Sequence, residues 1–273
     1  MPEIGIVETR NIINVINQKY NYDFSDYALT SLKRRIEKII EQNNLKYPDI
    51  LINRLTDEPQ FIHPFIDQLT TGSTEMFRDP SLWRLLREEI LPTLQNETGK
   101  DLKIWLPFSV SGDELFSLAI MLHEMNLLDK ASILVSALSE TSIETMKSGI
   151  MLNSKEEISC DNYVRANGKL ALPKYYTLTD GRITRDISLI KNVRFTKQNI
   201  ETEPVPQNIK LVLFRNKMIY FNTTLQNRIL KTIYNTMVPN GILAIGTKES
   251  ISTLYGNNNF IRISKTESIY KRK

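Results

Sequence analysis

One segment constrains the fold of this chain more than any other, because an apolar run, a polar loop and an apolar helix follow one another without a break. Ile104–Leu106 is typical of a buried strand, Ser109–Gly112 of a loop, and Asp113–Ile120 of a helix. In open α/β sheets, ligands bind outside the carboxyl ends of the strands. The loop after this strand therefore lies where a ligand would bind if the protein uses one.

The rest of the chain after residue 99 repeats this alternation. Short apolar or β-branched runs at residues 102–106, 132–138, 193–195, 210–214 and 242–246 are separated by segments with helical spacing. This pattern is typical of a largely parallel sheet with helices on both of its faces. The sequence therefore predicts an α/β fold.

Two regions differ from that pattern. From Glu8 to about Leu69 the apolar residues recur at helical spacing and predict several short helices and no strand. Residues 174–184 are typical of a hairpin with an Asp-Gly type I′ turn. We therefore predict a helical domain over residues 1–72 and an α/β domain over residues 73–273, with a small antiparallel β insertion at about residues 153–191. Asp79 before Pro80 predicts an N-cap where the helix after residue 79 begins.

The composition excludes several functional classes. The net charge of +4, from 35 basic and 31 acidic residues, is too balanced to indicate nucleic-acid binding. Cys160 is the only cysteine, and His63 and His123 lack metal-ligand spacing, so we expect no disulfide and no metal. There is no signal peptide pattern and no stretch near the roughly 20 apolar residues of a membrane span. We expect a cytoplasmic protein that is not inserted in a membrane.

Five short motifs stand in order along the chain. They are Thr74–Pro80, Ser111–Ser117, Ser148–Ile150, Arg215–Phe221 and Gly246–Ser250. Together they resemble the CheR-type chemoreceptor methyltransferases, which use S-adenosylmethionine to esterify glutamate side chains of bacterial chemoreceptors, and the match covers nearly the whole chain. The second motif, Ser-Gly-Asp-Glu-Leu-Phe-Ser, is similar to the family's S/T-G-E-E-x-Y-S. The resemblance implies a helical N-terminal domain and a mostly parallel seven-stranded methyltransferase sheet that carries a small antiparallel subdomain.

The resemblance also implies roles for individual residues. Arg78 and Tyr220 would line the site around the transferred methyl group and its acceptor. Contacts to the cofactor would come from Thr74, Gly112, one of the acidic pair Asp113 and Glu114, Asn199, Arg215 and Asn216.

The same residues also have ordinary interpretations. Arg78 could be a surface arginine paired with Glu75 or Asp79, and Tyr220 a core residue. The acidic pair could merely favour the start of the following helix through its dipole.

Several residues depart from the family pattern where it holds the cofactor. Ala137 and Ser139 stand where the family has two aspartates after the second strand, whose carboxylate accepts hydrogen bonds from the ribose hydroxyls. Phe108 replaces a small residue after the first strand, Gly72 replaces an asparagine, and Lys217 replaces an apolar residue. Hydrogen bonds to charged groups are worth about 1.5–3 kcal/mol, so losing the ribose acceptor alone weakens binding about ten- to a hundredfold. The departures predict that S-adenosylmethionine binding is weakened or lost.

Lys33, Arg34 and Arg35 occupy a place similar to the family's basic helix, which faces the acidic receptor bundle. The alternative is a solvated helix face. Two functions remain open: an active or weak methyltransferase for protein glutamates, and a catalytically silent relative that binds a receptor or a signalling partner. A dinucleotide-dependent oxidoreductase is disfavoured, because the first loop lacks the G-x-G-x-x-G spacing.

Overall fold

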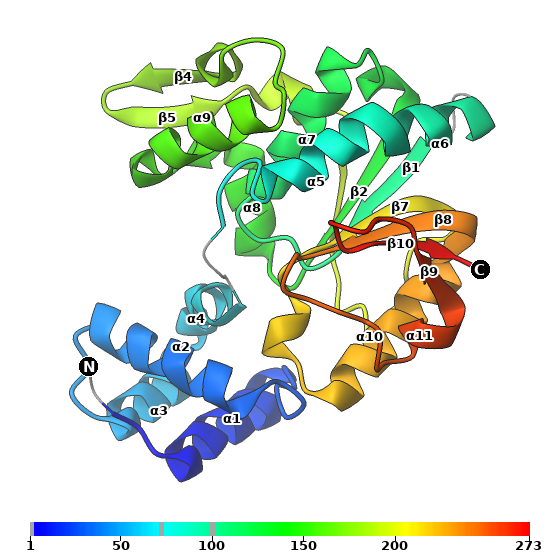
Figure 1. Ribbon diagram of the computed structural model, residues 1–273. Coiled ribbons are helices and arrows are strands. Elements are labelled where there is room, and N and C mark those ends of the chain that lie inside the picture. Colours follow the sequence, from blue (N-terminus) through cyan, green and yellow to red (C-terminus); the bar gives the residue numbers. More distant parts are fainter. Residues whose placement is uncertain (1–2, 71–73, 99–101) are drawn as a thin grey trace.

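Within the described residues 3–70, 74–98 and 102–273, the chain forms a helical N-terminal region, a seven-stranded sheet and a small antiparallel sheet (Figure 1). This architecture is that of a computed structural model. The N-terminal helices, drawn in blue, lie beside α10 (Thr223–Thr236), and the small sheet lies at the opposite end of the molecule. The predicted α/β fold class is confirmed.

The N-terminal region is helical because each of its helices buries one apolar side. On the second helix, Leu32, Ile36 and Ile39 recur at helical spacing and are all buried. No helix among the described residues is both long enough and apolar enough to cross a membrane. The helices are α1 (Ile6–Tyr20), α2 (Leu29–Gln42), α3 (Pro48–Asp57) and α4 (Ile62–Thr70).

The main sheet is parallel except at one edge. Its strand order is β6-β2-β1-β7-β8-β10-β9, and the pairs from β6 to β8 are parallel. The last two strands are antiparallel, and the sequence pattern had not singled them out. The strands are β1 (Leu102–Leu106), β2 (Ala131–Ala137), β6 (Arg194–Lys197), β7 (Ile209–Phe214), β8 (Met237–Ile245), β9 (Phe260–Arg262) and β10 (Ile269–Arg272).

Helices cover both faces of the parallel strands. In β1, Ile104 and Leu106 pack in one core with the helices of one face, while Trp105 packs in a second core with α10. Because the strands are buried on both sides, a ligand can approach them only at their ends. The helices of the first face are α5 (Pro80–Leu85), α6 (Leu91–Thr98), α7 (Asp113–Glu124) and α8 (Glu140–Ser148), and a short α11 (Gly256–Asn259) precedes β9.

The small antiparallel sheet follows α8. It contains β3 (Ile150–Met151), β5 (Arg182–Arg185) and β4 (Tyr176–Thr179), and α9 (Glu156–Arg165) lies between β3 and β4 in the chain. The hairpin turn has positive φ at both central positions, 50° at Asp180 and 71° at Gly181, as a type I′ turn requires. The strand β3 precedes residue 153, so one strand of this sheet lies outside the β insertion predicted at about residues 153–191.

The helical region is joined to the sheet by backbone hydrogen bonds after β7. Tyr27 and Phe221 form an antiparallel β-bridge. The Ala28 amide donates to the Tyr220 carbonyl at 2.8 Å, and the Asn222 amide donates to the Asp26 carbonyl at 2.8 Å. We call this junction the seam. It fixes the segment that carries Tyr220 against the N-terminal helices.

Candidate functional site

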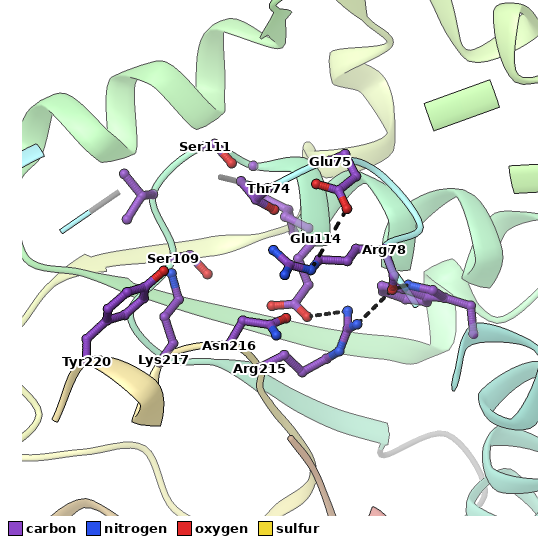
Figure 2. Close-up of a pocket in the computed structure, with 14 residues that line it drawn as sticks. Thr74, Glu75, Arg78, Ser109, Ser111, Glu114, Arg215, Asn216, Lys217 and Tyr220 are labelled. Atoms are coloured by element: carbon purple, nitrogen blue, oxygen red, sulfur yellow. Dashed lines mark hydrogen bonds and ion pairs between the residues drawn. The ribbon is translucent and has the colours of Figure 1, made fainter. Parts of the chain in front are cut away.

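A pocket opens at the carboxyl ends of β1 and β7 (Figure 2). Most of its residues come from three segments, Thr74–Arg78 ahead of α5, Ser109–Leu115 after β1, and Arg215–Tyr220 after β7, and Trp83 of α5 also lines it. The space inside it, which includes the solvent at its open mouth, is about 630 Å³. We call it the first-loop pocket. It lies at the loop that the strand–loop–helix segment predicted.

A buried arginine ties these segments together (Figure 2). Arg215, only 5% exposed, donates from Nη1 to Glu114 Oε1 at 3.0 Å. Its Nη2 donates to Asp79 Oδ2 at 2.8 Å and to the Arg78 carbonyl at 2.7 Å. Asp79 precedes α5 as expected, but its side chain makes no capping hydrogen bond and pairs with Arg215 instead. Burial raises the pKa of Glu114, and the charges of Arg215 and Lys217 oppose that rise.

Arg78 and Tyr220 both line the first-loop pocket (Figure 2). Arg78 Nε lies 3.9 Å from Glu75 Oε1, and a third of the Arg78 side chain is exposed. Tyr220 ends a 3₁₀ turn, and the Arg35 guanidinium lies 3.8 Å from the centroid of its ring. Arg78 therefore lies near Glu75, as expected of a surface arginine, and also lines the pocket.

Lys217 is a partly buried cation of the same pocket. Among the described residues, its ammonium group has no hydrogen bond or ion pair. Burial lowers the pKa of Lys217, and the charges of Arg35 and Arg78 lower it further, while Glu114 and Glu249 act in the opposite direction. Burying a charge without a partner is costly, so this site favours an anion.

Asp113 turns away from the pocket, unlike its neighbour Glu114. It is 2% exposed and accepts hydrogen bonds from Arg185 Nη1 at 2.8 Å and from Lys155 Nζ at 2.9 Å. Arg185 belongs to β5, so this carboxylate holds the small sheet against the start of α7. Successive helical residues point about 100° apart, which separates the two acids. Of the predicted acidic pair, the structure brings only Glu114 to the pocket.

Three more predicted cofactor contacts line the pocket: Thr74, Gly112 and Asn216. Gly112 has φ of +79°, a conformation that favours glycine. The backbone N–H of Asn216 donates to Glu249 Oε2 at 2.9 Å, and the backbone N–H of Gly246 donates to the same oxygen at 2.7 Å. Sequence reasoning missed the role of Glu249 in shaping this loop, although its place in the fifth motif was an available signal.

Asn199 does not join the other predicted residues. Its Oδ1 accepts a hydrogen bond from the Glu201 amide at 3.0 Å, and it lines a separate hollow.

A buried chain of side-chain hydrogen bonds lies near the end of β2. Trp105 Nε1 donates to Ser136 Oγ at 3.0 Å, and Ser136 Oγ donates to Gln198 Oε1 at 2.7 Å. No motif pointed to this buried chain, because it joins residues far apart in the sequence.

A second hollow adjoins the first at the seam and shares Ser109, Val110, Lys217 and Tyr220 with it. The space inside it, which includes the solvent at its open mouth, is about 360 Å³. None of the described residues that line it is an aspartate or a glutamate. We call it the seam pocket, and its rings and cations are Tyr27, Phe108, Tyr220, Phe221, Arg35 and Lys217.

Phe108 is a wall of the seam pocket and not of the first-loop pocket. Its ring is 8% exposed, with centroids 5.6 Å from Phe221 and 5.9 Å from Phe214. Its φ of 55° lies in the left-handed region that glycine favours. A large ring thus occupies a backbone conformation suited to the small residue that the family pattern has here.

Neither departure at the end of β2 offers a charged acceptor. Ala137 is fully buried in the core. Ser139 Oγ accepts a hydrogen bond from the Ser142 amide at 3.0 Å, which caps α8, and donates to Asp67 of α4. Ser139 therefore joins α8 to the helical region. Gly72, the remaining departure, lies outside the described residues.

The basic segment of α2 divides into residues with different surroundings. Lys33 Nζ lies 3.6 Å from Glu37 Oε1, and Arg34 is exposed. Arg35 instead faces the seam, where it stacks on Tyr220. Only part of the predicted partner surface is therefore open to a partner.

The parallel sheet and the pocket at its carboxyl edge define an α/β protein of the methyltransferase class. The family model for the CheR methyltransferase SAM-binding domain matches residues 72–269, and that for the CheR methyltransferase all-alpha domain matches residues 8–70. The chain therefore belongs to the CheR methyltransferase family, and the predicted family is confirmed. The match also supports S-adenosylmethionine as the cofactor of this domain.

Two relatives from Pseudomonas putida agree with this assignment. Cher3 of Pseudomonas putida is 33% identical over 267 residues, which is 97% of each chain. Cher2 of the same species, a chemotaxis protein methyltransferase, is 25% identical over 84% of this chain and 85% of its own. Among solved structures, a SAM-dependent O-methyltransferase of Thermotoga maritima has a TM-score of 0.41 at 10% identity, over 73% of this chain and 56% of its own.

The residues present fit one end of S-adenosylmethionine better than the other. Its ammonium and carboxylate match Glu114 and Arg78 of the first-loop pocket, which supplies opposite charges for both. Its ribose hydroxyls find no carboxylate at Ala137 or Ser139. Among the described residues, charges that suit the amino-acid end line the first-loop pocket, and Ala137 and Ser139 offer the sugar end no charged acceptor.

Proposed function

We propose that this chain is a chemoreceptor methyltransferase whose affinity for S-adenosylmethionine is reduced, and that it esterifies glutamate side chains. One observation supports this proposal above all: Arg78, Glu114 and Tyr220 line one pocket at the carboxyl edge of the sheet. The missing acid at Ala137 supports the reduced affinity. The names of chemotaxis relatives support a chemoreceptor as the substrate.

Positioning accounts for the chemistry in this proposal. S-adenosylmethionine supplies an electrophilic methyl group. A glutamate side chain titrates near ~4.3 and is already ionised at neutral pH, so no general base is needed. Arg78 attracts carboxylates, Glu114 attracts positive charge, and Arg215 holds Glu114 in place. Holding the reacting groups in line supplies the rate enhancement.

Titration calorimetry with S-adenosylmethionine and its demethylated product tests the donor site. We expect binding about ten- to a hundredfold weaker than with a ribose-binding carboxylate. Glu114→Gln should weaken it further, because Glu114 lines the pocket. Asp113→Asn is the matched control and should leave it unchanged, because Asp113 faces Arg185. No heat at millimolar ligand would exclude ordinary catalysis.

Restoring the sugar end gives a second test. Ala137→Asp combined with Phe108→Gly should recover donor affinity if these departures cause the weakness. Because Ala137 is fully buried, thermal unfolding must first show that the double variant folds. A folded variant with unchanged affinity would show that the departures are not the cause.

The partner surface can be tested separately. Arg34 is exposed on α2, so Arg34→Glu should weaken association with an acidic receptor fragment, most at low salt. Arg262→Glu, on the exposed β9 edge, is the control. Equal effects of the two variants would argue against α2 as the docking helix.

A second candidate is a catalytically silent module that binds a receptor or a signalling partner. The aromatic walls of the seam pocket, Phe108 above all, favour it. Mass spectrometry of a chemoreceptor incubated with the chain and S-adenosylmethionine separates the two candidates. Methyl esters on receptor glutamates would exclude the silent module.

A further inference from the structure

Asp26 holds the segment that follows Tyr220, although it belongs to the loop ahead of α2. Its backbone carbonyl accepts a hydrogen bond from the Asn222 backbone N–H at 2.8 Å, and its Oδ1 accepts one from Asn222 Nδ2 at 2.9 Å. The Ala28 backbone N–H donates to the Tyr220 carbonyl at 2.8 Å. The loop ahead of α2 therefore fixes the backbone at Tyr220 and again at Asn222.

The carboxylate of Asp26 is itself held by an ion network. Arg228 of α10 donates from Nη1 to Asp26 Oδ2 at 2.7 Å and from Nη2 to Glu201 Oε2 at 2.8 Å. Hydrogen bonds from Asn222 and Arg228 lower the pKa of Asp26, so its carboxylate is charged at neutral pH. The Glu201 backbone N–H donates to Asn199 Oδ1 at 3.0 Å. Asn199, which does not join the other predicted site residues, therefore supports this network.

The ring of Tyr220 depends on the same region for its direction. The Arg35 guanidinium lies 3.8 Å from the ring centroid, and Arg35 belongs to α2, which begins directly after this loop. The ring lines the first-loop pocket, whereas Asp26 lines the separate hollow that contains Asn199. The backbone of Tyr220 and the cation over its ring are thus both set by the stretch that Asp26 anchors.

We infer that Asp26 is a positioning residue for Tyr220 and acts through its two hydrogen bonds with Asn222. The inference rests on the proposed function for the catalytic meaning of Tyr220, but the direction of the ring can be measured with no methyl donor present. Exposed ion pairs contribute about 0–1 kcal/mol, and the Arg228 side chain is half-exposed. The network therefore orients Asp26 more than it stabilises the fold.

Fluorine NMR of the full chain labelled with 3-fluorotyrosine tests the inference, and Tyr220→Phe identifies the resonance of Tyr220 by its loss. Asp26→Ala should shift this resonance toward its position in the urea-unfolded chain, because the ring loses its fixed contact with Arg35. Asp57→Ala, at an exposed aspartate of α3, is the matched control and should leave the resonance in place. Thermal unfolding verifies that each variant is folded.

An exchange of the two side chains supplies a rescue. Asn222→Asp keeps the oxygen that accepts from the Leu225 amide and caps α10, but it sets a second carboxylate against Asp26. It should shift the Tyr220 resonance as Asp26→Ala does. Adding Asp26→Asn restores one donor facing one acceptor and should return the resonance to its original position. The inference is overturned if folded Asp26→Ala leaves the resonance in place, if Asp57→Ala shifts it equally, or if the double variant gives no return.

Methyl transfer to a receptor fragment gives the catalytic readout. Asp26→Ala should lower kcat about ten- to a hundredfold, because a small misplacement near the reacting atoms has an effect of that size. Donor affinity should stay unchanged, because Glu114 is held by Arg215 and not by the seam. An unchanged kcat would overturn the inference. If the unaltered chain transfers no methyl group, the proposed function fails, and the fluorine resonance still decides whether Asp26 positions the ring.

Discussion

The first-loop pocket and the seam pocket share residues but differ in how their charges are balanced. In the first-loop pocket, Arg215 is held between Glu114 and Asp79, and Arg78 lies near Glu75. In the seam pocket, Arg35 and Lys217 face aromatic rings without an acid. Two of the residues that depart from the family pattern, Phe108 and Lys217, line the seam pocket, and Lys217 lines the first-loop pocket as well.

This difference teaches that two adjoining pockets can differ in how firmly their lining residues are tied to the fold. The ion network of Arg215 joins α5, α7 and β7, so the fold itself depends on it. The walls of the seam pocket are side chains such as Phe108 and Lys217, which can change without breaking that network. The two pockets therefore differ in what holds their lining in place, which is an ion network in the first and the packing of aromatic rings in the second.

The largest effect is expected from Arg215→Gln. It leaves Glu114 and Asp79 without their cation, and breaking a buried ion pair on one side costs about 3–5 kcal/mol. Urea unfolding measures the loss. The exposed Arg34→Gln should change stability by about 0.5 kcal/mol or less. Comparable losses in the two variants would mean that the network does not support the fold.

Phe108 offers a test of the seam pocket wall. Phe108→Ala should cost about 3–5 kcal/mol, because the ring packs on Phe214 and Phe221. Phe108→Gly should cost about 1 kcal/mol less than Phe108→Ala, since φ is 55° and glycine adopts this conformation without strain. Chemical denaturation of both variants measures the difference. An alanine variant more stable than the glycine variant would contradict the strained backbone.

Asp113→Asn should cost about 1.5–3 kcal/mol in unfolding free energy, because charge-assisted hydrogen bonds from Arg185 and Lys155 are weakened. Asp129→Asn, at an exposed aspartate, is the matched control. If Asp113→Asn proved as stable as Asp129→Asn, Asp113 would not be what holds the small sheet in place. Unlike Glu114→Gln, this change should leave donor affinity unaltered.

The smallest effect concerns Lys217 and depends on pH. Burial lowers its pKa in the folded state, with Arg35 and Arg78 adding to the effect and Glu114 and Glu249 opposing it. Between that value and ~10.4, the unfolded chain binds more protons, so native stability rises with pH. Lys217→Met should therefore stabilise the protein by about 1 kcal/mol near pH 7.

The advantage of Lys217→Met should shrink as the pH approaches ~10. Thermal unfolding at the two pH values measures the change, relative to the exposed-site variant Lys265→Met. An advantage that stays constant or grows with pH would show that the lysine is not destabilised in the folded state.

Much of the fold could be predicted from local pattern. The run at residues 102–106 is β1, and the Asp180-Gly181 turn joins β4 and β5. Apolar spacing predicted the buried side of α2, as at Leu32 and Ile36. Local pattern succeeds here because strand alternation, helix spacing and turn chemistry are properties of neighbouring residues. The strands β9 and β10 were missed because the sheet holds them through antiparallel pairing with distant β8.

The sequence by itself determined the family, the order of the elements and the loop at which the pocket opens. Tertiary structure decided which side chains meet there. Asp113 forms an ion pair with Arg185 and Glu114 forms one with Arg215, although the two acids are neighbours in the chain. Arg35 was expected on the surface of the docking helix, but the tertiary structure places it in the lining of the seam pocket. The physical reason is that side-chain direction and partners depend on elements far apart in sequence, which no local pattern encodes.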